Sequence, residues 1–158
     1  MLYIQFEIKD QKKYTVFKKI YDVLYEIKPK EESKPLAFWE ETIPEYAKTF
    51  LQRFYNLENA LSPLVRENFK ATVNYLEFGL EADFTDLTMI NAITARIDFQ
   101  ALGYPYGGMD RLLIFLKAFD CIPNEVFNGF SVCQLSWKTQ YDYSALELPE
   151  KTATYLKR

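Results

Sequence analysis

Two segments of the chain alternate apolar and polar residues at every second position, and this pattern restricts the fold more than any other feature. In residues 2–8 and in residues 93–101 the apolar side chains would lie on one face of a strand and the polar ones on the other. A half-buried strand is the usual reading of such alternation. We therefore expect both segments to belong to a sheet that is covered on one side.

Helical spacing of apolar residues appears between and after these strands. It runs through residues 16–27, where Asp10 would cap the preceding turn, through residues 44–57, and through Met109–Phe119. Ser62 followed by Pro63 resembles the start of a further short turn of helix.

Strand-like composition occurs elsewhere in the chain. It is found in residues 69–84, where Gly79 suggests a bulge or a turn, and in residues 130–137, with 138–148 as a hairpin partner. Residues 85–91 fit either a loop or one helical turn.

The resulting order is β-α-α-β-β-α-β-β, without the regular βαβ alternation or the GxGxxG motif of doubly wound nucleotide-binding folds. This order predicts an α+β fold: a two-layer sandwich of a mainly antiparallel sheet with helices on one face. A chain of 158 residues fits one domain, 1–158, whose last residues, 151–158, would be frayed or form a short helix.

The chain contains no histidine, which limits its chemistry severely. Histidine is the usual general base near neutral pH and the commonest zinc ligand, so Ser-His-Asp, Cys-His and His-ligated metal sites are excluded. Any reaction would have to use carboxylates, tyrosines, lysines, arginines or the two cysteines. We therefore favour a protein that is not an enzyme and binds no cofactor.

Charge and cysteine content indicate the surroundings in which the protein works. The net charge of −3 disfavours non-specific binding of nucleic acid. Cys121 and Cys133 lack metal-ligand spacing and fit reduced thiols. The first ten residues do not resemble a signal peptide, and the longest dense apolar run, Leu112–Leu116, is too short to cross a bilayer. We expect a cytoplasmic protein without membrane contact.

The glycine-dense loop that leads into the third predicted helix is the best candidate ligand site. Glycine backbone N–H groups before a helix can meet an anion, an arginine can add a bidentate contact, and tyrosines can flank the ligand. In the alternative reading the glycines only allow a sharp turn, and Asp110 would repel an anion. The residues concerned are Tyr104, Tyr106, Gly107, Gly108 and Arg111.

Two further groups of charged residues have competing readings. Arg96 and Asp98 lie two residues apart on one strand face, where they could clamp a ligand or simply keep the surface soluble. Glu77, Glu81 and Asp83 could join them around a hard cation such as Mg²⁺, although no cation-binding loop motif supports this and we predict no metal site.

An aromatic set near the C-terminus predicts a protein interface, with cross-strand packing as the competing reading. Its members are Phe130, Trp137, Tyr141 and Tyr143. We therefore expect a small non-catalytic interaction protein, such as an adaptor or an immunity- or antitoxin-like inhibitor, that binds a protein partner through an aromatic and acidic surface. The alternative is a small-molecule or anion-binding domain centred on Gly103–Arg111, which could also be a histidine-independent enzyme, and self-association stays open.

Overall fold

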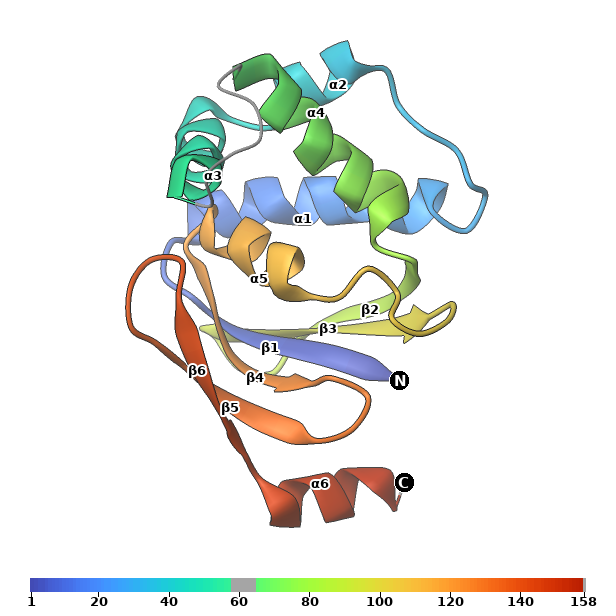
Figure 1. Ribbon diagram of the computed structural model, residues 1–158, viewed down its shortest axis with the longest axis vertical. Helices are drawn as coiled ribbons and strands as arrows, with labels where there is room; N and C mark the ends of the chain where they lie inside the picture. The colour runs from blue at the N-terminus through green and yellow to red at the C-terminus, as the bar shows by residue number, and fades with distance from the viewer. Residues whose placement is uncertain (58–64, 158) are drawn as a thin grey trace.

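The computed structural model describes residues 1–57 and 65–157. Within them, six strands form one antiparallel sheet in the spatial order β2-β3-β1-β4-β5-β6 (Figure 1). The strands are β1 (Leu2–Ile8), β2 (Ala82–Met89), β3 (Thr94–Ala101), β4 (Cys121–Phe127), β5 (Val132–Trp137) and β6 (Tyr143–Glu147). The fold is the predicted α+β sandwich.

Among the described residues, helices cover one face of this sheet, and a short helix lies on the other face (Figure 1). The covering elements are α1 (Gln11–Ile27), α2 (Leu36–Thr42), α3 (Glu45–Leu57), α4 (Val65–Asn74), the π-helical turn η1 (Tyr75–Gly79) and α5 (Asp110–Lys117). The helix on the opposite face is α6 (Pro149–Leu156), which includes residues 151–156.

The first strand lies inside the sheet, and its two faces contact different helical layers. β1 pairs with β3 on one side and with β4 on the other, and Ile4 and Phe6 are fully buried beneath the helices. On the opposite face Tyr3 packs against Tyr155 of α6, with ring centroids 5.2 Å apart. α1 follows at once, and the Asp10 carboxylate accepts a hydrogen bond from the Lys13 N–H at 3.1 Å as its cap.

The prediction of a strand over residues 69–84 is wrong in most of its length. Residues 69–79 continue α4 and form η1, and the strand begins only at Ala82. Aromatic and β-branched residues gave the segment a strand-like composition, but burial of Thr72, Tyr75 and Leu76 follows a helical face. The segment 85–91, which was ambiguous, supplies most of β2.

One strand, β4, has no counterpart in the sequence prediction. Its pairing with β1 is shifted by an irregularity between Gln5 and Phe6, and Pro123 lies within it. Both features interrupt the alternation by which a strand is recognised. The predicted helical turn after Ser62 lies outside the described residues.

Two buried lysines connect the helical layer to its neighbours. Lys28 Nζ donates to the carbonyl oxygens of Leu76 and Leu80, both at 2.8 Å, and thereby holds the end of η1. Lys117 Nζ donates to the Gln140 carbonyl at 2.6 Å and so ties the β5–β6 turn to α5. Burial lowers the pKa of each lysine to about 8.

Candidate functional site

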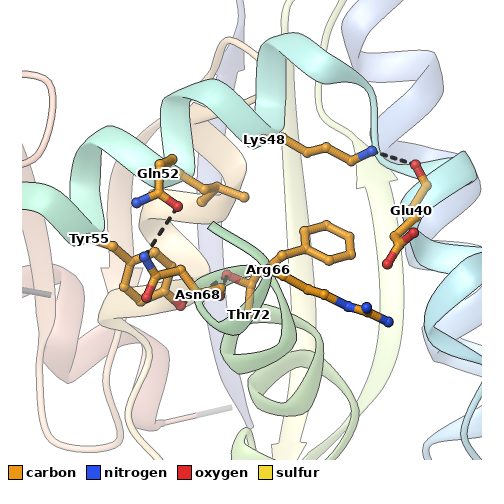
Figure 2. A pocket seen from close by; sticks show the side chains of 9 residues that line it. Glu40, Lys48, Gln52, Tyr55, Arg66, Asn68 and Thr72 are labelled. Carbon is orange, nitrogen blue, oxygen red and sulfur yellow. Dashed lines mark hydrogen bonds between the residues drawn. The ribbon is translucent and has the colours of Figure 1, made fainter. Parts of the chain in front are cut away.

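Two hollows of comparable size lie on the helical side of the molecule. We call the first the sheet-end groove, a space of about 380 Å³ between the loop before α5 and the strands β4, β5 and β6. We call the second the helical pocket, an open hollow of about 460 Å³ between α2, α3 and α4 (Figure 2).

The sheet-end groove has an apolar floor and an aromatic rim. Buried Leu113, Val126 and Leu135 line its floor. Tyr104 and Phe130 stand at the rim with exposed fractions of 78% and 67%, and their rings meet edge to face at 5.8 Å. Exposed aromatic rings beside an apolar hollow are typical of a recognition surface.

A single charged side chain lines this groove among the described residues, and it is Asp110. Its Oδ1 accepts a hydrogen bond from the Tyr143 hydroxyl at 2.5 Å. Burial and this hydrogen bond to Asp110 raise the pKa of Tyr143, so the phenol remains a donor. The exposed carboxylate gives the groove an acidic character.

The loop that forms the rim is held by close backbone contact with η1. Gly107 has φ +78°, and a Cβ placed on it would lie 1.9 Å from the Gly79 carbonyl oxygen. Next to it, the Glu81 N–H donates to the Tyr106 carbonyl at 2.9 Å. Only glycine fits at position 107, which explains part of the glycine density of this loop.

The groove runs beside β6, which is an edge strand of the sheet. Tyr143 and Ala145 of β6 line the groove, while Leu146 on the other face is 63% exposed. In the described part of the chain no residue outside β5 hydrogen-bonds to the backbone of Tyr143–Glu147. The outer edge of β6 therefore presents unpaired backbone donors and acceptors.

The helical pocket combines an apolar floor with charged groups on one side. Its lining comprises Glu40, Lys48, Leu51, Gln52, Tyr55, Arg66, Asn68, Phe69 and Thr72. Figure 2 shows Glu40, Lys48 and Arg66 gathered on one side, with Gln52, Asn68, Tyr55 and Thr72 on the other. The latter four form two hydrogen-bonded pairs: Asn68 Nδ2 donates to Gln52 Oε1 at 3.2 Å, and the Tyr55 and Thr72 hydroxyls are 2.9 Å apart.

The predicted ligand residues do not form one site. Tyr104, Tyr106 and Gly108 line the sheet-end groove, whereas Gly107 packs closely against the backbone of Gly79. Arg111 lies in a separate small recess, 5.9 Å from the centroid of the Tyr75 ring.

Arg96 and Asp98 lie on the opposite face of the sheet. Arg96 Nη2 donates to Asp98 Oδ1 at 2.9 Å, and the guanidinium stacks 3.8 Å from the Tyr3 ring centroid. They can therefore not cooperate with Tyr104 or Arg111 around one ligand.

The predicted interface residues bind the β5–β6 hairpin to the rest of the fold. Trp137 Nε1 donates to the Pro123 carbonyl at 2.8 Å, and Lys117 Nζ lies 3.8 Å from its ring centroid. The Tyr141 hydroxyl donates to the Phe50 carbonyl at 2.9 Å. Of the four predicted residues, Phe130 and Tyr143 line the sheet-end groove, whereas Trp137 and Tyr141 do not.

Metal and thiol chemistry receive no geometric support in the part of the chain that the structure describes. There, no three Asp, Glu or Cys side chains come together as a ligand set. Glu77 instead accepts hydrogen bonds from Trp39 Nε1 at 3.1 Å and from the Lys34 N–H at 2.8 Å. Both cysteines are free and buried, and burial raises the pKa of Cys121 to about 12.

The helical pocket was not foreseen from the sequence, although a signal for it exists. Lys48, Leu51, Gln52 and Tyr55 follow the i, i+3, i+4, i+7 spacing of one helix face. That face mixes cationic, amide and aromatic side chains, so it does not stand out as an apolar stripe. The edge position of β6 depends on strand order, which no local pattern carries.

Comparison with protein family models, with curated proteins and with solved structures gives no match. Within residues 1–57 and 65–157, no helix has the length and apolar character needed to cross a membrane.

Proposed function

We propose that this protein is a non-catalytic interaction module that binds an extended segment of a partner protein along β6. The segment would pair with the open edge of β6 and place alternate side chains over the sheet-end groove. The observation that carries this proposal is the combination of an unpaired strand edge with an apolar, aromatic-rimmed hollow at its side.

The two edges of the sheet support this choice of β6. The β2 edge carries Asp83 and Asp86 and an irregularity in register between Phe84 and Asp86, features that discourage pairing with another strand. β6 pairs with β5 in continuous register, has no proline or lysine, and exposes Leu146. The β6 edge is therefore the one suited to accept a further strand.

The lining of the groove determines the chemistry of the partner segment. Main-chain hydrogen bonds would provide affinity without sequence preference, and the groove would select the side chains on one face. Tyr104, Phe130 and the floor favour apolar or aromatic residues at every second position. Asp110 favours one lysine or arginine among them, because its exposed carboxylate is the groove's charged group.

Anion binding by the Gly103–Arg111 loop is the weaker candidate. Asp110 lines the groove and would repel an anion, while Arg111 lies in another recess.

The two free thiols agree with a reducing compartment, and we place the protein in the cytoplasm on that ground.

Selection from a displayed library of unstructured peptides tests the proposal. We expect enriched peptides to alternate apolar residues and to carry one lysine or arginine. Asp110→Asn should weaken the best peptide about tenfold, because it removes the charge that faces the basic residue. Asp86→Asn on the opposite edge is the matched control and should leave binding unchanged.

Two results would contradict the proposal. Enriched peptides without a basic residue or without alternation would remove the argument for the groove. An equal loss of affinity for Asp110→Asn and Asp86→Asn would show that the peptides respond to the net charge of the protein and not to this site.

A further inference from the structure

We infer that the helical pocket is a second, independent binding site, and that it takes a small amphipathic carboxylate. The ligand would have an apolar body of about ten carbon atoms or fewer, a size that fits a hollow of about 460 Å³. This inference concerns residues of α2, α3 and α4 and does not rest on the proposed function.

The apolar body is favoured by the way the inner polar groups are paired. The Asn68 amide donates a hydrogen bond to the Gln52 side-chain oxygen, and the Tyr55 and Thr72 hydroxyls are hydrogen-bonded to each other. These polar groups therefore already have partners within the lining. The surfaces left for a ligand are then those of Leu51, the Tyr55 ring and Phe69. Contact with such side chains is favourable for an aliphatic or aromatic body.

The carboxylate is favoured by the two cations at the opposite side of the hollow. Lys48 and Arg66 both line it, and Figure 2 shows their side chains on the same side. In the described part of the chain neither forms an ion pair: Lys48 Nζ donates to the Glu40 carbonyl at 2.5 Å and lies 5.5 Å from the Phe69 ring centroid. Arg66 supplies a planar donor set that matches a carboxylate.

Glu40 carries the opposing charge at this mouth. Its carboxylate faces the same side as Lys48 and Arg66, so two positive charges and one negative charge leave the mouth with a net charge of +1. An anionic head group is attracted on balance, and Glu40 limits its affinity. A cationic head group on the same apolar body is repelled on balance.

Isothermal titration calorimetry with three eight-carbon probes tests the site: octanoate, 1-octanol and octylammonium. We expect octanoate to bind most tightly and octylammonium at least tenfold more weakly than octanoate. Arg66→Gln and Lys48→Gln should each raise the Kd for octanoate about fivefold and leave 1-octanol unchanged. Glu40→Gln should lower the Kd for octanoate.

Lys70→Gln is the matched control, because Lys70 lies on the same helix as Arg66 but pairs with Glu67 and does not line the pocket. It should leave all three affinities unchanged. The inference is overturned if octylammonium binds as tightly as octanoate, or if Lys70→Gln has the effect of Arg66→Gln.

Gln52→Trp separates this pocket from any other apolar surface. Gln52 is half-buried, so an indole at this position can enter the hollow while the helix is retained. We expect the variant to lose binding of octanoate and of 1-octanol, with its folding verified by circular dichroism. Octanoate binding that persists in the folded variant would place the ligand elsewhere and contradict the inference.

Discussion

The sheet-end groove and the helical pocket have similar volumes but opposite chemistry. The groove has an acidic group, exposed aromatic rings and an open strand edge beside it, whereas the pocket has two cations and one carboxylate beside a floor of apolar side chains. A strand edge can pair with the backbone of an extended chain, while a hollow between three helices offers only side chains and has room for a small molecule. Size alone therefore says little about what a hollow binds, and the surrounding backbone and charge decide it.

The two hollows are also maintained by different means. The groove depends on the loop at Gly107 and on the β5–β6 hairpin, which Lys117 ties to α5. The pocket depends on α4, whose continuation in η1 is held by Lys28. Substitutions at these positions should affect one hollow and spare the other, which makes the comparison open to experiment.

The largest effect is expected from Gly107→Ala. The new Cβ would lie 1.9 Å from the Gly79 carbonyl oxygen, and the positive φ is itself unfavourable for alanine. We expect a loss of about 3 kcal/mol in the free energy of unfolding, measured by urea denaturation. Gly103→Ala has open space around it and should cost far less. Equal losses for the two variants would show that the loop is not held against η1.

Replacement of the buried lysines should come next in magnitude. Lys28→Met leaves the carbonyls of Leu76 and Leu80 without their donor and should cost about 2 kcal/mol, whereas Lys117→Met should cost about 1 kcal/mol. Octanoate binding should fall only in the first variant, and peptide binding only in the second. Lys19→Met on the exposed side of α1 is the control. A loss of both ligands in either variant would contradict the separate maintenance of the two hollows.

A smaller effect is expected from pH, through the same two lysines. Because their folded-state pKa values of about 8 lie below the ordinary value for lysine, the unfolded chain binds more protons between pH 8 and pH 10. The free energy of unfolding should therefore rise over this range, by an amount on the order of 1 kcal/mol per lysine. Urea denaturation at pH 8 and pH 9.5 measures the rise. Each lysine-to-methionine variant should lose part of it, and an unchanged rise in both would refute the assignment of the rise to these lysines.

The smallest effect on stability should come from the two sheet edges. Leu146→Lys on β6 and Met89→Lys on β2 both replace exposed side chains and should change the free energy of unfolding by less than about 0.5 kcal/mol. Their effects on peptide binding should differ, because a lysine on β6 opposes strand addition there. We expect at least a tenfold loss of affinity for Leu146→Lys alone, measured by fluorescence anisotropy. The reverse pattern would move the binding edge to β2.

The sequence predicted the elements whose two faces differ clearly in polarity. β1, β3 and α1 were found because their apolar residues repeat at a single period. α4 was mistaken for a strand because Val73, Tyr75 and their neighbours favour a sheet by composition, while their helical burial depends on tertiary packing. β4 was missed because the shift in its pairing and Pro123 disturb the alternation.

The candidate sites were less accessible from sequence than the fold. The loop at Tyr104–Gly108 was singled out by its glycines and does border a hollow, but Arg111 turns to another recess. Trp137 and Tyr141 were singled out as exposed rings, and their polar atoms are used to hold the hairpin. Both the groove and the pocket join residues that are distant in sequence or lie on different helices, and strand order and helix packing alone bring them together.

Hydrogen exchange of the backbone amides, with and without the best selected peptide, tests strand addition to β6 most directly. Within the described part of the chain, β5 is the only strand that pairs with Tyr143–Glu147, so the amides on the outer side of β6 lack a backbone partner there. They should therefore exchange fast in the free protein. We predict that the peptide slows exchange in β6 by at least tenfold and leaves β2 unchanged. Unaltered exchange in β6 at saturating peptide, or protection confined to β2, would contradict the account.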